Sequence, residues 1–135
     1  MTAINKLKAL TNYRRHVKML DSFQMRHLRY LMGIKWQDKI TNNEVSQRAK
    51  IDGMEAMLMR AQLRWVGYVQ RMSDNRMPKQ IIYSELSSGA RIRGGQRKRY
   101  KDTLKQTLKM TSIDTETWHE LAENRTGWKY AKTVV

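Results

Sequence analysis

The chain has 135 residues, of which 40% are hydrophobic, and it carries 27 lysines and arginines against 12 acids, for a net charge of +15. These numbers allow one modest hydrophobic core, and the charge surplus favours a polyanionic partner, most simply nucleic acid. The sequence has no cysteine for disulfides or thiolate metal sites, and no run of 18 apolar residues that could span a bilayer.

The surplus charge is concentrated in two segments. Residues 1–50 carry a net charge of +8 and residues 89–111 a net charge of +7, whereas residues 51–88 carry +1 and residues 112–135 carry −1. This uneven distribution predicts two separate contact surfaces for a polyanion.

Residues 14–34 are predicted to form an amphipathic helix that ends at Gly33, a residue type that favours helix C-termini. Its apolar side contains Val17, Leu20, Phe23, Leu28 and Leu31. Its opposite side carries a secondary basic stripe of Arg15, Lys18, Arg26 and Arg29, which is a candidate phosphate-binding surface.

Residues 36–40 read as a connector. Thr41 and Glu44 then have the spacing of a capping box, which predicts a short helix over residues 42–49. Asp52 or Gly53 opens a long helix over residues 53–72.

The long helix is predicted to bury one stripe and to present arginines elsewhere. The predicted buried stripe consists of Met54, Met57, Leu58, Ala61, Trp65, Tyr68, Val69 and Met72. Arg60, Arg64 and Arg71 share another side, with Gly67 beside them as bare backbone, and guanidinium groups match phosphate geometry. Met59, Leu63 and Val66 form a second apolar patch that would need a partner to cover it.

The rest of the chain alternates turns and helices. Pro78 suits the first turn of a short segment over residues 78–86, with a short strand at 81–83 as an alternative. Three glycines make residues 87–95 a loop, and a helix resumes over residues 96–110 with Tyr100, Leu104 and Leu108 on one side. Asp114 or Thr115 is predicted to cap a last helical region.

The segment 89–101 is the strongest candidate site, because glycines let the backbone approach phosphates and the cations supply electrostatic affinity. Its candidate nucleic-acid-binding residues are Arg91, Arg93, Gly94, Gly95, Arg97, Lys98, Arg99 and Lys101. Two other interpretations stay open for this segment, a solvated basic loop without a target and a nuclear-import signal.

Neither catalytic nor metal-ligating residues stand out. His16, His27 and His119 are scattered without carboxylates at ligand spacing, so we expect no metal and no cofactor. Among the tryptophans, Trp65 is predicted to pack in the core, and Trp118 and Trp128 to pack the last helices onto the body. Tryptophans such as Trp36 could also stack on bases.

Several stretches together resemble one family. The segment from Arg60 to Met72, RAQLRWVGYVQRM, resembles the Leu-Arg-Trp-x-Gly-His-x-x-Arg-Met motif that lies downstream of the polymerase core in reverse transcriptases of non-LTR (LINE-type) retrotransposons, especially the RTE-like clade. Residues 20–29, 33–45, 85–105 and 114–128 are similar to further family motifs in the same order. The departures are Tyr68 for the usual His, His27 for the usual Cys and Asn124 for a frequent Asp.

The resemblance implies the thumb and C-terminal extension, which grip template and primer. From the resemblance together with the helical patterning described above, we predict an all-α fold of five to six helices with a basic Gly-rich loop, in a single domain over residues 1–135. Within it, residues 10–72 would form thumb-like helices, residues 73–95 a connector and the basic loop, and residues 96–135 the C-terminal helices.

We expect no enzymatic activity. The family's Tyr-x-Asp-Asp polymerase motif does not occur, nor does its N-terminal endonuclease, and Asp21, Asp38 and Asp52 lie in separate elements with no predicted convergence. The expected partners are RNA, RNA–DNA hybrid or DNA, together with a separate polymerase core, and no membrane. The expected location is intracellular and nuclear.

Two alternatives stay open. Residues 45–53, together with the start of the next helix, have the residue pattern of a helix-turn-helix motif, although Lys50 occupies the turn position usually taken by Gly. Such a motif would make this a sequence-specific DNA-binding protein. The other alternative is a decayed fragment that has no autonomous activity and needs a missing polymerase core.

Overall fold

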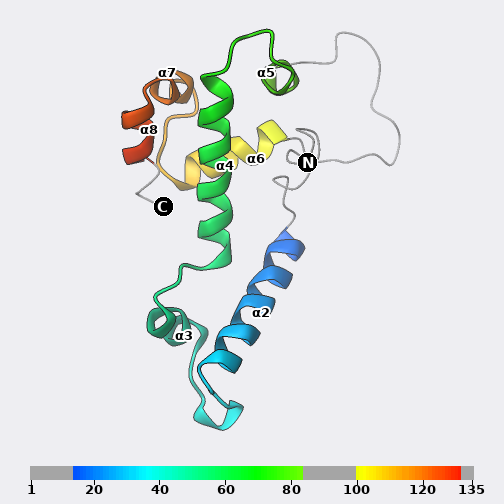
Figure 1. Ribbon diagram of the computed structural model, residues 1–135, viewed down its shortest axis with the longest axis vertical. Helices are drawn as coiled ribbons and strands as arrows, with labels where there is room; N and C mark the ends of the chain where they lie inside the picture. The colour runs from blue at the N-terminus through cyan, green and yellow to red at the C-terminus, as the bar shows by residue number, and fades with distance from the viewer. Residues whose placement is uncertain (1–13, 84–99, 132–135) are drawn as a thin grey trace, which may run out of the picture. The chain divides into compact units, whose positions relative to one another are not determined.

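The computed structural model describes residues 14–83 and 100–131, and this part of the chain is entirely helical (Figure 1). The elements are α2 (Arg14–Leu31), the 3-10 turn η1 (Trp36–Asp38), α3 (Asn42–Ala49), α4 (Met54–Gln70), α5 (Met77–Tyr83), α6 (Tyr100–Met110), α7 (Trp118–Glu123) and α8 (Arg125–Ala131). The all-α prediction is confirmed, with seven α-helices in the described residues where five to six were expected. Residues 81–83 are helical, so the alternative of a strand there was wrong.

The described residues fall into two compact units. The N-terminal unit comprises the described residues up to Met59, and the C-terminal unit comprises those from Arg60 onward. Each has its own cluster of buried side chains. The predicted division of the chain at residues 73 and 96 stays a prediction, and the Gly-rich loop lies outside the described residues.

The N-terminal unit is built by packing α3 against α2. Its core consists of Met25, Leu28 and Val45, with Met32, Ile34, Ile40 and Ala49 packed around them. The predicted apolar side of α2 was therefore largely wrong. Phe23 is 58% exposed and Leu31 is 76% exposed, because α3 covers only the side of α2 that carries Met25 and Leu28.

The end of α2 is fixed by a Schellman motif. Gly33 has a φ of +64°, its amide donates to the Tyr30 carbonyl at 3.2 Å, and the Ile34 amide donates to the Arg29 carbonyl at 2.9 Å. Ile34 then packs on the small core, which turns the chain toward α3. The predicted stop at Gly33 is confirmed.

Both ends of α3 are also defined by local hydrogen bonds. The predicted capping box is confirmed, since the Glu44 amide donates to Thr41 Oγ1 at 3.3 Å and the Thr41 amide donates to Glu44 Oε2 at 2.9 Å. At the other end Lys50 takes the left-handed conformation with a φ of 53°, and α6 ends in the same way at Ser112 with a φ of 57°.

The C-terminal unit places α4 at its centre, and the ribbon of α6 crosses that of α4 in Figure 1. Leu63, Val66 and Val69 of α4 are buried with Leu104 and Leu108 of α6. The same cluster takes in Ile82 of α5, Ala122 of α7 and Trp128 of α8, together with Ile113. The prediction that Leu104 and Leu108 share the inner side of α6 is confirmed.

The predicted buried face of α4 was partly right, since Val69 is buried and Trp65 and Met72 pack against the core, and partly wrong. Tyr68 and Met57 are exposed, whereas Leu63 and Val66, predicted to need an external partner, are fully buried within the chain. The actual inner face also contains Gln62 and Gln70. Thr107 Oγ1 donates to Gln62 Oε1 at 2.6 Å, and the Tyr83 hydroxyl donates to Gln70 Oε1, so hydrogen bonds from other helices satisfy the side-chain oxygen of each glutamine.

The last helical region is two helices rather than one. Asp114 accepts hydrogen bonds from the Glu116 amide at 3.0 Å and the Thr117 hydroxyl at 2.9 Å, which fixes a turn before α7 begins at Trp118. Asn124 interrupts the region and starts α8, because its Oδ1 accepts from the amides of Thr126 and Gly127, each at 3.1 Å.

Trp128 is seated directly on the backbone of α4. Its indole Nε1 donates to the Leu63 carbonyl at 2.8 Å, and the ring lies over Gly67. A Cβ atom at residue 67 would stand 2.1 Å from that nitrogen, so only glycine lets the ring lie this close. The predicted role of Trp128 in packing the last helices onto the body is confirmed.

We expect substitutions at the left-handed helix ends to act in opposite directions. Gly33→Ala should destabilise the protein by about 1 kcal/mol, because an alanine there meets no neighbouring atom and costs only the positive φ. Ser112→Gly should instead stabilise it by roughly 0.5 kcal/mol, since relief of the same strain exceeds the extra chain entropy of glycine. Urea midpoints would measure both, and a shift of the same sign for the two variants would contradict this account.

Gly67→Ala should be among the most damaging small substitutions in the C-terminal unit. Displacing the Trp128 ring should cost about 1–3 kcal/mol, by overpacking and by weakening the hydrogen bond to Leu63. Thermal or urea unfolding would measure it, with Gly127→Ala as the control because its added Cβ meets only ordinary contacts of 3.4 Å or more.

In a Trp128→Leu background the same Gly67→Ala change should cost less than about 1 kcal/mol, because the clashing ring is gone. Equal costs in the two backgrounds would show that the ring is not the reason for glycine at residue 67.

Candidate nucleic-acid interface

The main predicted site lies outside the described residues. This holds for Arg91, Arg93, Gly94, Gly95, Arg97, Lys98 and Arg99, so their role stays a prediction. Lys101 is described, and it is half-buried in the first turn of α6.

The predicted row of Arg60, Arg64 and Arg71 is not fully available for a ligand, because Arg71 makes a hydrogen bond within the protein. Arg71 donates from Nη1 to the Ala122 carbonyl at 2.7 Å, which ties α4 to α7. Gly67 is covered by Trp128 and cannot offer bare backbone to a phosphate, so that part of the prediction was wrong. Arg60 is half-buried, and Arg64 is exposed next to the exposed Tyr68 one turn further on.

Three of the four cations in the predicted basic stripe on α2 are exposed. Arg15, Lys18 and Arg26 are exposed, and Ser22 lies between them on the same side at helical spacing. At 1.5 Å per residue the stripe from Arg15 to Arg26 is about 16 Å long. Its fourth member is used internally, because Arg29 donates from Nη2 to the Ile40 carbonyl at 2.7 Å and to Asn42 Oδ1 at 2.9 Å.

Two acids of the N-terminal unit are engaged in local capping. Glu44 and Asp38 cap turns, since Asp38 Oδ2 accepts from the Lys35 amide at 2.8 Å. Hydrogen bonds from the Thr41 amide and hydroxyl lower the pKa of Glu44 below its usual value. The single acid of α2, Asp21, lines a groove next to α3 and is a helical neighbour of only one stripe cation, Lys18, so most of the positive charge of the stripe is not offset from within α2.

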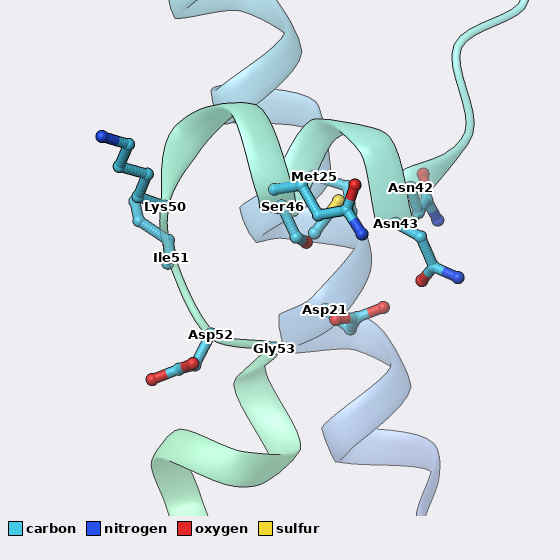
Figure 2. Close-up of a pocket in the computed structure, with 10 residues that line it drawn as sticks. Asp21, Met25, Asn42, Asn43, Ser46, Lys50, Ile51, Asp52 and Gly53 are labelled. Atoms are coloured by element: carbon cyan, nitrogen blue, oxygen red, sulfur yellow. The ribbon is translucent and has the colours of Figure 1, made fainter.

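Asp21 faces an open groove of about 620 Å³ between α2, α3 and the 50–53 turn (Figure 2). Its lining consists of Asp21, Met25, Asn42, Asn43, Ser46, Gln47, Lys50, Ile51, Asp52 and Gly53. Asp21 and Asp52 thus line one groove, which the sequence did not predict, although their carboxylates point away from each other in Figure 2. With two acids and one lysine in its lining, this groove does not extend the basic stripe of α2.

Three of the four tryptophans have structural roles. Trp128 is buried and lies 6.2 Å from the half-buried Trp118 ring, as expected for packing of the last helices. Trp65 is half-buried and meets Tyr100 edge to face at 5.5 Å, at the border of the core. Trp36 differs from all of them, because it is 82% exposed in η1. The sequence signal for it was its place in a connector between Lys35 and Lys39.

The turn after α3 bears on the helix-turn-helix alternative in two ways. Lys50 adopts the left-handed conformation that such a turn requires, so the missing glycine is no obstacle. Ile51, however, is 39% exposed rather than buried between two helices, and α3 packs on α2. The local turn fits the motif and the packing around it does not.

Within residues 14–83 and 100–131, no three His, Asp or Glu side chains gather closely enough to hold a metal ion. The helices of the same residues include none with the length and apolar character needed to cross a membrane. Searches with this chain matched no protein-family model, no curated protein and no solved structure.

Arg64 of α4 and Arg71, the residue that follows α4, should differ in their effect on stability. Arg71→Ala should cost about 1.5–3 kcal/mol in unfolding free energy, because the Ala122 carbonyl loses a charged donor. Arg64→Ala, the matched control on the same side of α4, should change it by less than about 0.5 kcal/mol. Chemical denaturation measures both, and equal costs would contradict the assignment.

Proposed function

We propose that this chain binds nucleic acid mainly through phosphate contacts and catalyses no reaction. The observation that carries the proposal is the α2 stripe, where Arg15, Lys18 and Arg26 are exposed on one side of the helix and the helix has a single acid, Asp21, next to one of them. Side chains at this spacing on a helix can contact successive phosphates of one strand. The net charge of +15 provides long-range attraction.

The sequence resemblance to the C-terminal region of non-LTR reverse transcriptases supports a more specific proposal, that the target is a template-primer and that the chain works with a separate polymerase core in the nucleus. The segment 89–101, with its glycines and cations, would add a second phosphate contact. Lack of the Tyr-x-Asp-Asp motif supports a gripping rather than a polymerising role.

A salt series tests the proposal with one pair of variants. The double substitution Lys18→Gln with Arg26→Gln should reduce the slope of log Kobs against log salt by about 1.4–1.8, the amount expected for two lost phosphate contacts. Lys105→Gln with Lys109→Gln removes the same charge from exposed positions on α6 and should change the slope much less. Equal effects of the two pairs would show diffuse attraction and contradict a dedicated stripe.

The ligands in that series are a recessed RNA–DNA primer-template and DNA duplexes of several sequences. We expect the primer-template to bind best and the duplexes to bind alike. Large differences among the duplexes would favour the helix-turn-helix alternative, which the turn at Lys50 supports. No binding at low salt would refute the proposed function.

A further inference from the structure

Trp36 is carried by a turn whose backbone is fixed on both sides. The Lys35 amide donates to Asp38 Oδ2 at 2.8 Å, and the Lys39 amide donates to the Trp36 carbonyl at 3.3 Å. Before the turn, the Ile34 amide is bonded to Arg29, and after it the Arg29 guanidinium holds the Ile40 carbonyl. The tryptophan therefore projects from a defined position on the N-terminal unit rather than from a loose loop.

An indole left 82% exposed gives up most of the free energy that its burial would provide. The other three tryptophans of this chain are buried or half-buried. A backbone held by hydrogen bonds and a largely exposed ring suit a stacking surface, because little backbone entropy remains to be lost when a ligand binds.

The charges around the ring indicate the ligand. Lys35 and Lys39 flank Trp36, and both are exposed. Tyr30, 84% exposed, lies one helical turn beyond Arg26, so the α2 stripe leads toward the end of the helix that enters this turn. Aromatic rings interleaved with cations bind unpaired bases and their phosphates together.

We propose that Trp36 stacks on an unpaired base of single-stranded nucleic acid whose phosphates contact Lys35, Lys39 and the α2 stripe. This inference rests on the proposed function and adds to it the class of ligand. A base inside a duplex has both faces covered by its neighbours, so a stacking ring selects single strands, overhangs or loops. The contact is tolerant of sequence, because every base has a π-face.

The test compares binding of wild-type chain, Trp36→Ala and Trp36→Phe to three ligands of equal length, namely a single-stranded oligonucleotide, a blunt duplex and an abasic strand that has phosphates but no bases. Trp36→Ala should weaken single-strand binding about 5- to 100-fold. Trp36→Phe should recover most of the loss, and duplex and abasic-strand binding should change less than about twofold.

Tyr130→Ala is the matched control, because Tyr130 is also a largely exposed aromatic next to a lysine, Lys129, but in the C-terminal unit. It should leave single-strand binding unchanged. Tryptophan fluorescence supplies an independent reading, since quenching by the single strand should be present in wild-type chain and lost in Trp36→Phe.

Four other results would contradict stacking by Trp36, and each points to a different explanation. Salt-dependent binding that Trp36→Ala leaves unchanged would refute the stacking and preserve the proposed function, whereas no binding of wild-type chain to any strand would refute both. If Trp36→Ala weakened binding to vesicles of phosphatidylserine and phosphatidylcholine but not to oligonucleotides, Trp36 would be assigned to a membrane surface. If Trp36→Ala abolished self-association in sedimentation but left oligonucleotide binding intact, Trp36 would be assigned to a contact with a second copy of this chain.

Discussion

The C-terminal unit depends on the contact between the Trp128 indole and the backbone of α4. The ring lies where a Cβ at Gly67 would stand, and its N–H reaches the Leu63 carbonyl, so α8 is held against α4 by both packing and a hydrogen bond. Around that contact the leucine and valine side of α4 is covered by α6 and α7. Arg71 adds a second link, from α4 to the carbonyl of Ala122. Two positions of the inner face of α4, Leu63 and Gly67, therefore meet this one tryptophan.

The cations of the described residues divide into those that hold the fold and those that face water. Arg29, Arg71 and Lys79 donate to backbone carbonyls, and Lys79 does so at the end of α4, where the carbonyls of Gln70 and Met72 are each 3.0 Å from its Nζ. Lys79 also pairs with Asp74 and lowers the pKa of that carboxyl. Lys18, Arg26, Lys35 and Lys39 face water on the N-terminal unit. A basic sequence does not by itself tell these two uses apart, and only the second kind can serve a polyanion.

Local features were predicted well because neighbouring residues decide them. The capping box at Thr41 and Glu44, the stop at Gly33 and the extents of α2, α3 and α4 depend on hydrogen bonds within a few residues. The burial of Gln62 and Gln70 in α4 was missed because their hydrogen-bond partners, Thr107 and Tyr83, lie outside that helix. The split between α7 and α8 was missed because Asn124 was not read as a cap.

By itself the sequence determined that this protein is helical, strongly basic and free of cysteine. Helix ends, charge and composition are local or additive properties, so they can be read along the chain. The tertiary structure alone decided that Gly67 serves Trp128 rather than a phosphate, that Arg71 and Arg29 bind carbonyls, and that Trp36 stands exposed. The reason is that burial and partner choice depend on which distant segments come together.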